Sequence, residues 1–181
     1  MAKKDLVEEI EIPQGINVEI EGLEYSFSGP KGKVTKKFNN PSVQIQKQDN
    51  MIKIFAKSAS KKEKAVLKAY KAHILNAFKG CNEPFLYKLK ICSGHFPMSV
   101  AVNNNRLVIK NFLGEKVPRE VQLNSDAKVK IDGANIYVES SDKEKAGQAA
   151  ATIEQATRRP GFDKRIFQDG IYITDKAGKE I

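Results

Sequence analysis

Ser60-Lys61-Lys62-Glu63-Lys64-Ala65 and Ser141-Asp142-Lys143-Glu144-Lys145-Ala146 share one pattern, in which glutamate follows serine by three positions and lysine and alanine come next. In such a capping box, the serine and glutamate side chains bind backbone N–H groups that the first turn of a helix leaves free. The pattern predicts a helix at each stretch. Because the two starts lie 81 residues apart in a chain of 181 residues, they also indicate an internal duplication.

Both predicted helices are amphipathic. Apolar residues recur after each capping box at spacings of three and four, which is typical of a helix that packs on a sheet. The apolar face of the first helix consists of Val66, Leu67, Tyr70, Ile74, Ala77 and Phe78, and that of the second consists of Ala146, Ala149, Ala150, Ile153 and Ala156. Gly80 is expected to end the first helix, and Arg158-Arg159-Pro160-Gly161 the second.

A pair of short strands precedes each helix. The strands are Val43–Lys47 and Ile52–Ala56 in the first half, and Lys128–Ile131 and Asn135–Glu139 in the second. All four alternate apolar and polar residues, as half-buried strands do. Asp132-Gly133 lies between the second pair and is a strong hairpin signal. Each half is therefore expected to place a hairpin directly before its helix.

The segments before these hairpins also correspond. Gly29-Pro30-Lys31-Gly32-Lys33 and the predicted strand Val34–Phe38 match Leu113-Gly114-Glu115-Lys116 and the predicted strand Val117–Val121. Further short alternating strands precede both loops. We therefore predict an α+β fold of two tandem duplicated modules, residues 1–82 and 83–181, each an antiparallel sheet packed with one helix.

Composition narrows the class of protein. The sequence contains no run of 18 apolar residues, so no membrane-spanning helix is predicted. The N-terminal residues lack the apolar segment of a secretory signal. Cys81 and Cys92 are the only cysteines, and without an export signal we expect them to be reduced thiols in a cytosolic chain.

Charge is unevenly distributed along the chain, whose formal net charge is +9. Residues 1–25 carry a net −5, residues 26–84 a net +10 and residues 85–181 a net +4. Such asymmetry favours a polyanionic partner, although a solvated charged surface would give the same composition.

Two loops carry candidate phosphate contacts. Lys31 and Lys33 lie at a glycine-flexible tip, and Lys110 and Lys116 flank the corresponding loop of the second half. Gly29-Pro30-Lys31-Gly32-Lys33 is not a Walker A loop, because its glycines are too close together and Val34 stands where Ser or Thr is needed. A plain hairpin with solvated lysines is the alternative.

The C-terminal stretch from Arg158 has no counterpart in the first half. It combines basic side chains, which suit phosphate, with aromatic rings, which suit bases or sugars. The basic residues are Arg158, Arg159, Lys164, Arg165, Lys176 and Lys179, and the aromatic residues are Phe162, Phe167 and Tyr172. We expect residues 158–176 to be dispensable for folding and necessary for RNA binding, although the rings could instead anchor the stretch to its own module.

Two groups of residues could support enzyme chemistry. Cys92-Ser93-Gly94-His95, with His73 and Cys81 upstream, contains zinc-ligand residue types, but their spacing matches no zinc-finger pattern. Cys92 and His95 could form a thiol–imidazole pair, yet no orienting residue is evident nearby. A small metal- or thiol-dependent enzyme remains the alternative function, while the preferred reading assigns no catalytic residue, metal or cofactor.

The last part of the chain resembles a known family. Arg165-Ile166-Phe167-Gln168-Asp169-Gly170-Ile171-Tyr172-Ile173, followed by Lys176, resembles the signature of the archaeal and eukaryotic branch of large-subunit ribosomal protein six. Weaker matches are Glu11-Ile12-Pro13, Gly29-Pro30-Lys31-Gly32 and Gly94-His95-Phe96-Pro97. Residues Gly161–Arg165 depart from the Gly- and Lys-rich tail of the bacterial branch, so contacts of that tail do not transfer.

The resemblance implies a structural, non-enzymatic protein of the cytoplasmic ribosome with a duplicated fold. It implies binding to large-subunit rRNA beside the sarcin–ricin region, near the base of the factor-binding stalk. Neighbouring ribosomal proteins, nearby translation factors and a single copy per ribosome follow from the same resemblance, and no membrane is involved. The expected RNA-binding residues are Lys31, Lys33, Lys110, Lys116, Arg158, Arg159, Lys164, Arg165 and Lys176.

Overall fold

The computed structural model of the chain describes residues 4–123, 125–163 and 165–181. The chain divides after Pro84 into two compact units, and each is described by itself. In the described part, no helix is long and apolar enough to cross a membrane.

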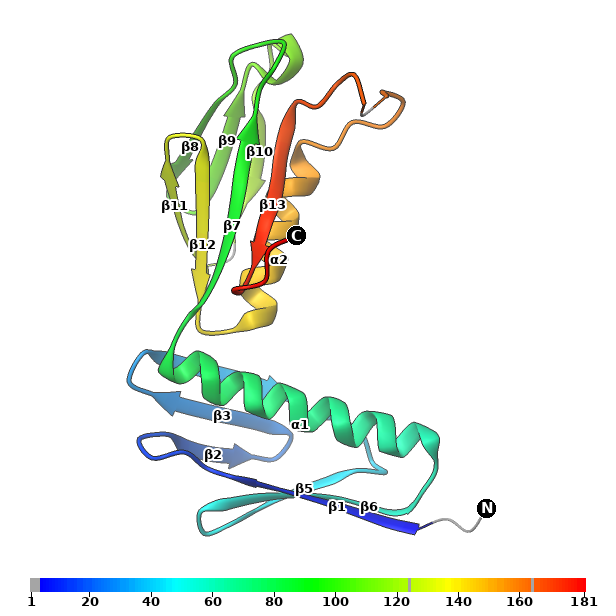
Figure 1. Cartoon of the computed structure of the whole chain (residues 1–181). Helices are drawn as coiled ribbons and strands as arrows, with labels where there is room; N and C mark the ends of the chain where they lie inside the picture. The colour runs from blue at the N-terminus through cyan, green and yellow to red at the C-terminus, as the bar shows by residue number, and fades with distance from the viewer. Residues whose placement is uncertain (1–3, 124, 164) are drawn as a thin grey trace. The chain divides into compact units, whose positions relative to one another are not determined.

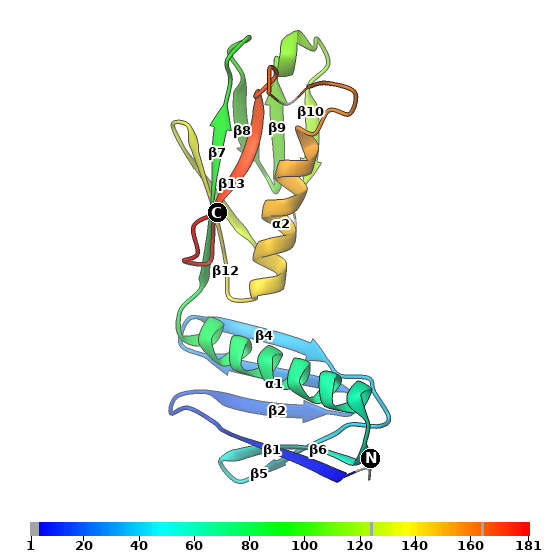
Figure 2. The same ribbon diagram turned by 45° about the vertical axis from the view of Figure 1, so that its right-hand side comes forward.

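The first unit contains six strands and one helix among its described residues (Figures 1 and 2). In chain order they are β1 (Lys4–Glu11), β2 (Asn17–Glu21), β3 (Glu24–Gly29), β4 (Gly32–Lys37), β5 (Gln44–Gln48), β6 (Met51–Ala59) and α1 (Lys61–Asn82). The strands form two antiparallel sheets, ordered β1-β6-β5 and β2-β3-β4, and α1 packs against strands of both.

The second unit repeats this arrangement with one additional strand. Its elements are β7 (Phe85–Cys92), β8 (Ser99–Asn103), β9 (Arg106–Lys110), the 3-10 helix η1 (Phe112–Gly114), β10 (Arg119–Gln122), β11 (Lys128–Asp132), β12 (Asn135–Ser140), α2 (Lys143–Ala156) and β13 (Gly170–Lys176). The sheets of its described residues are β10-β9-β8 and β11-β12-β7-β13. The predicted α+β fold of two duplicated modules is therefore confirmed.

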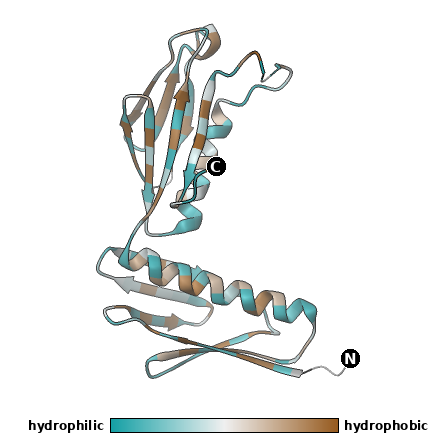
Figure 3. Cartoon of the chain, viewed as in Figure 1, coloured by the Kyte–Doolittle hydropathy of each residue, from teal (hydrophilic) through white to brown (hydrophobic). Residues whose placement is uncertain are grey.

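Each unit has its own apolar core. Along the strands, apolar residues alternate with polar ones (Figure 3), so one face of each sheet turns toward the helix. The predicted helix faces are confirmed. Leu67, Ile74, Ala77 and Phe78 are buried in the first unit, and Ala146, Ala149, Ala150 and Ile153 in the second.

The helix boundaries differ in part from those predicted. Ser60 and Glu63 form the predicted capping box. In the second unit, however, the N-cap is Asp142, whose carboxylate accepts a hydrogen bond from the backbone N–H of Glu144 at 3.0 Å, so the prediction of Ser141 was wrong. Gly80 does not end α1, which continues to Asn82 because buried Gly80 and Cys81 pack inside the unit.

Two predicted segments before the hairpins are also corrected. Pro30 and Lys31 form the tight turn between β3 and β4, so Lys33 lies in β4 rather than in the loop. In the second unit β10 begins only at Arg119, and the side chain of Val117 is 78% exposed. Pro118 explains the later start, because proline has no N–H to donate to a strand ladder.

Candidate nucleic-acid interface

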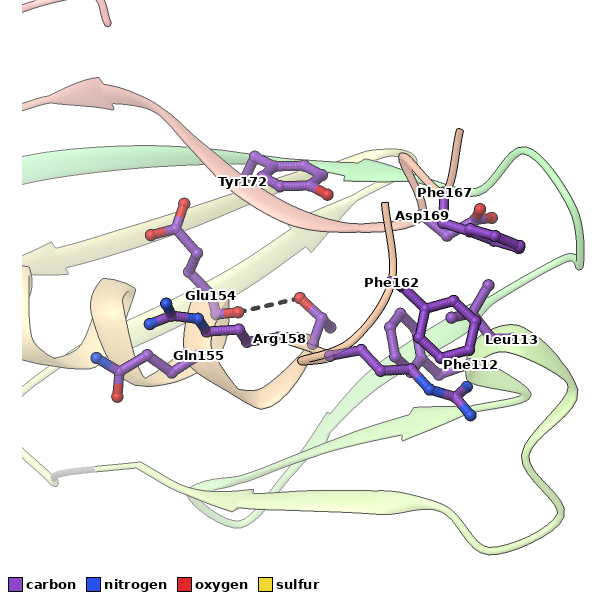
Figure 4. A pocket seen from close by; sticks show the side chains of 11 residues that line it. Phe112, Leu113, Glu154, Gln155, Arg158, Phe162, Phe167, Asp169 and Tyr172 are labelled. Carbon is purple, nitrogen blue, oxygen red and sulfur yellow. Dashed lines mark hydrogen bonds between the residues drawn. The ribbon is translucent and has the colours of Figure 1, made fainter. Parts of the chain in front are cut away.

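A cleft of about 390 Å³ opens at one end of the second unit (Figure 4). It lies between η1, the C-terminal end of α2 and the start of β13. Figure 4 shows Phe112, Leu113 and Phe162 gathered at one end of the cleft. Aromatic walls beside Arg158 and Arg159 give this cleft the mixture of stacking and cationic groups that single-stranded nucleic acid uses.

Arg119 fastens η1 and β10 to the end of α2. Its guanidinium donates to both carboxylate oxygens of Glu115, at 2.7 and 2.6 Å, and to the backbone oxygen of Ala156 at 2.7 Å. The same group lies 4.4 Å above the ring of buried Phe112. These hydrogen bonds from Arg119 lower the pKa of Glu115 despite the opposing effect of its desolvation. Arg119 thus stabilises the position of η1 and β10 against the end of α2, which form the cleft.

Aromatic side chains of the loop that follows α2 contact one another in series. The guanidinium of Arg159 lies 4.3 Å over the ring of Phe162 and 3.8 Å from a carboxylate oxygen of Glu115. Phe162 meets Phe167 edge to face at 4.9 Å, and Phe167 stacks on His95 at 5.0 Å. The loop thereby presents ordered aromatic surface next to a cation.

Asp169 ties this loop to the loop after β7. One carboxylate oxygen accepts the backbone N–H groups of Gly94, at 2.7 Å, and His95, at 3.0 Å. The other accepts Nδ1 of His95 at 2.5 Å. Burial by itself would raise the pKa of Asp169, but the backbone and side chain of His95 and the backbone of Gly94 outweigh it and lower the pKa. Asp169 is therefore an ionised anchor for both loops.

The start of β13 closes the remaining wall. The hydroxyl of Thr157 accepts the N–H of Ile171 at 2.9 Å, and Oε1 of Glu154 accepts the N–H of Ile173 at 3.0 Å. A Cβ at Gly170 would lie 3.2 Å from the ring of Tyr172, so glycine suits this close approach. Burial, and then the charges of Cys92, Asp169 and Glu154, raise the pKa of the Tyr172 hydroxyl.

The structure brings together most of the predicted basic residues of the second unit. Lys110 ends β9, Lys116 follows η1, and Arg158 and Arg159 follow α2. The loop after α2 lies at the same end of the unit as η1 (Figure 1), and it carries Arg165. We call this end, with Lys110, Lys116, Arg158, Arg159 and Arg165 and the aromatic cleft, the cleft end.

The other predicted basic residues lie elsewhere. Lys176 ends β13 opposite Tyr87, several residues along β7 from the Gly170–Cys92 pair, so it is not part of the cleft end. Lys31 and Lys33 belong to the β3–β4 hairpin of the first unit, and Lys164 lies outside the described residues. Arg165 is 90% exposed at its side chain and pairs with Asp163 at 2.8 Å.

The glycine-rich loop of the first unit has a packing role. A Cβ at Gly29 would lie 2.7 Å from Cβ of Cys81, and the N–H of Lys31 donates to the backbone oxygen of Cys81 at 3.0 Å. Gly29 therefore allows the hairpin to approach the end of α1. This packing explains the glycine without a bound phosphate.

The expectation of a dispensable C-terminal stretch was wrong for β13. This strand pairs with β7 from Gly170 to Lys176, and Ile171 is fully buried. Sequence reasoning also missed Phe112, Glu115 and Arg119, whose contacts build the cleft. Nothing local marks them, because an Arg and a Glu four residues apart in a polar segment usually lie on a solvated surface.

The residues of the enzyme alternative have contacts within the fold. His95 bonds to Asp169, so the expectation that no residue orients it was wrong. Cys92 ends β7 opposite Gly170, and Cys81 is buried, with Sγ donating to the backbone oxygen of Phe27 at 3.4 Å. Across residues 4–123, 125–163 and 165–181, no three His, Cys, Asp or Glu side chains gather so that they could hold a metal ion.

Comparison with known proteins identifies the family. The family model described as Ribosomal protein L6 matches residues 12–83 and 96–170. A protein of Sulfurisphaera tokodaii is 45% identical over 172 residues, which cover 94% of this chain and 92% of the relative. Relatives from Nanoarchaeum equitans and Methanosarcina mazei are 43% and 42% identical, cover 96% of this chain, and span 94% and 99% of their own lengths.

All three relatives are named "Large ribosomal subunit protein uL6". The resemblance seen in the C-terminal residues is confirmed, and the matched residues include parts of both duplicated units. The chain belongs to the ribosomal protein L6 family.

Proposed function

We propose that the protein is a structural constituent of the large ribosomal subunit and binds large-subunit rRNA through the cleft end. The observation that carries this proposal is an aromatic cleft lined by Arg158 and Arg159, with Lys110 and Lys116 on the segments before and after η1. These four cations lie at one end of the second unit, in a chain that belongs to a ribosomal protein family.

The cleft end suits RNA in two ways. Lysine and arginine at its rim neutralise phosphates and fix the register of the backbone. The rings of Phe162 and Tyr172, which are partly exposed, offer a face to an unpaired base or a sugar. Arg158 is the exposed cation next to these rings, whereas Arg119 is occupied by Glu115.

The family resemblance supports a more detailed assignment. We propose that the rRNA site lies beside the sarcin–ricin region, near the base of the factor-binding stalk, where translation factors approach. One copy would serve each cytoplasmic ribosome, with other ribosomal proteins as neighbours. The net charge of +9 is consistent with an RNA-rich environment.

The test measures binding to an rRNA fragment that contains the sarcin–ricin stem and loop. The combined variant Arg158→Gln and Phe162→Ala should weaken binding roughly tenfold or more, because it removes a phosphate contact and a stacking ring. The matched control is Lys128→Gln with Leu86→Ala, since Leu86 is 38% exposed and Phe162 is 39% exposed. Equal weakening by both variants would contradict the assignment to the cleft end.

Two further measurements separate the proposed role from its alternatives. In lysate sedimentation, the protein should move with large ribosomal subunits and leave them only at high salt. Cys92→Ser should leave rRNA binding intact. Loss of binding in that variant would favour a role for the thiol.

A further inference from the structure

The two units differ at one edge of one sheet. In the second unit β7 lies between β12 and β13. In the first unit β1 takes the place of β7, because β6 pairs with it as β12 pairs with β7, and the helix follows β6 as it follows β12. Among the described strands, only β6 pairs with β1. The duplication thus leaves open in one unit the edge that β13 fills in the other.

The register shows which backbone groups of β1 face outward. The N–H of Ile12 donates to the backbone oxygen of Asn50 at 2.9 Å, and the pairing continues from Glu11 opposite Met51 to Leu6 opposite Ala56. In an antiparallel pair, alternate residues direct their N–H and C=O groups toward the partner and away from it. The groups of Val7, Glu9 and Glu11 therefore point to the open edge.

Part of this edge, from Leu6 to Glu11, lacks two of the usual obstacles to pairing, proline and lysine. From Leu6 to Glu11 the register is regular, and its one shift lies between Lys4 and Leu6. The run contains no proline and no lysine, the residues that commonly block an exposed edge. Val7 is the second residue of this run, and 59% of its surface is exposed. A partner strand could therefore pair over several residues and cover this apolar side chain.

The charge of the strand restricts the partner. β1 carries Asp5, Glu8, Glu9 and Glu11, in a chain whose residues 26–84 and 85–181 have net charges of +10 and +4. Glu8 and Glu9 have internal partners in Lys71, at 2.6 Å, and Lys53, at 3.1 Å. An acidic strand repels RNA. A second copy would also be unfavourable, because β1 against β1 places like charges across the pair.

We propose that the open edge of β1 binds an extended, basic segment of another protein, which adds to the sheet as an antiparallel strand in the place that β13 takes on β7. Main-chain hydrogen bonds to Val7, Glu9 and Glu11 provide the pairing. Lysine or arginine side chains of the segment meet the acidic side chains of β1. The cleft end, by contrast, lies on the second unit and binds RNA independently of this edge.

Proline substitution provides a specific test. At position 9 it removes an N–H that points outward, so Glu9→Pro should leave the β1–β6 pairing intact but block an added strand. Glu9→Gln is the matched control, because it removes the same charge and keeps the N–H. The probe is a short peptide of alternating lysine and valine, titrated into the full-length chain while amide hydrogen exchange is followed by NMR.

The unsubstituted chain should bind the peptide, and exchange at Val7, Glu9 and Glu11 should slow on the order of tenfold or more. Glu9→Gln should retain that protection with weaker affinity, and Glu9→Pro should lose it at Val7 and Glu11, whose amides it keeps. Equal affinity of the two variants would overturn strand addition and leave only charge attraction. Absence of protection in the unsubstituted chain would overturn the proposal as well.

Assembled large subunits give the second readout. The amides of Val7 and Glu11 should exchange more slowly in the subunit than in the free chain, and Glu9→Pro should abolish the difference while rRNA binding persists. Fast exchange at Val7 and Glu11 in the subunit would contradict the proposal. Because the peptide titration involves no RNA, failure of the proposed rRNA binding would leave its result unaffected.

Discussion

At the scale of single residues, Asp169 determines how the loops of the cleft end are held. It is a buried carboxylate that accepts two backbone N–H groups and one imidazole. The residue that follows is Gly170, where a side chain would crowd Tyr172. Asp169 thus fixes the loop by its hydrogen bonds, and Gly170 directly after it begins β13.

Replacing Asp169 by asparagine should lower the free energy of unfolding of the second unit by about 1–3 kcal/mol at neutral pH. The pKa of this carboxyl is below its ordinary value of 3.8 in the folded chain, so its stabilisation is complete above that value and is lost as the pH falls through the lowered pKa. The difference between the two proteins should therefore shrink in acid below pH 3.8. Urea titrations followed by NMR signals of the second unit measure it.

Asp132→Asn is the control for this prediction, because Asp132 is an exposed hairpin residue of the same unit. It should change the free energy of unfolding by less than about 0.5 kcal/mol. A variant at Asp169 that is as stable as the unsubstituted chain at neutral pH would contradict the anchoring role.

Sequence reasoning at this scale succeeds where the physical cause is local. Ser60 caps a helix whose free N–H groups lie within a few residues, so the pattern contains the partners. Asp169 and His95 lie 74 residues apart, and Arg119 reaches Ala156 across the fold. No spacing in the sequence records such pairs. The basic residues and the rings of Phe162, Phe167 and Tyr172 were identifiable from the sequence, but the contacts of Phe112, Glu115 and Arg119 that complete the cleft were not.

At the scale of elements, β13 shows how a duplication can mislead. The first half closes its core without an equivalent strand, which suggested a tail with no folding role. The structure instead adds β13 to the outer edge of β7, where Ile171 is fully buried. Apolar and polar residues alternate in Gly170–Lys176 as in a half-buried strand. The strand could therefore be predicted from the sequence, but its pairing with β7 could not.

Ile171→Ala should lower the free energy of unfolding of the second unit by about 2–5 kcal/mol, because it leaves a cavity under β13. The matched control is Ile166→Ala, on the preceding loop, where the side chain is 63% exposed and the cost should be under about 0.5 kcal/mol. Thermal unfolding of both variants makes the comparison. A chain ending at Thr157 should also lose cooperative unfolding of this unit, and a fully cooperative truncated chain would restore the view of a dispensable tail.

At the scale of the whole molecule, the two units have separate cores and separate sheets. We expect residues 1–84 and residues 85–181 to fold when expressed apart, since the described apolar side chains of each core lie within one unit. Dispersed amide NMR spectra that overlay on those of the full chain would support this expectation. Collapse of either fragment to an unfolded spectrum would show that its core needs the other unit.

Lysines of both units are candidates for phosphate contact, and the salt dependence of RNA binding tests each pair. On a DNA duplex, each neutralised phosphate contributes roughly −0.9 to the slope of log affinity against log salt, and on single strands roughly −0.7; similar slopes are expected for rRNA. Lys110→Gln with Lys116→Gln should therefore reduce the magnitude of the slope by up to about 1.8 if both lysines contact phosphate. Lys31→Gln with Lys33→Gln should have a similar effect only if the β3–β4 hairpin also reaches the RNA.

Lys128→Gln with Lys130→Gln is the charge-matched control for these pairs, because both lysines are exposed on the edge strand β11, away from the cleft. Filter binding to the rRNA fragment at several salt concentrations gives the four slopes, including that of the unsubstituted chain. If only the Lys31 and Lys33 pair changes the slope, the interface belongs to the first unit. Affinity that ignores salt would contradict phosphate contact altogether, because counterion release accompanies every neutralised phosphate whichever residue provides the cation.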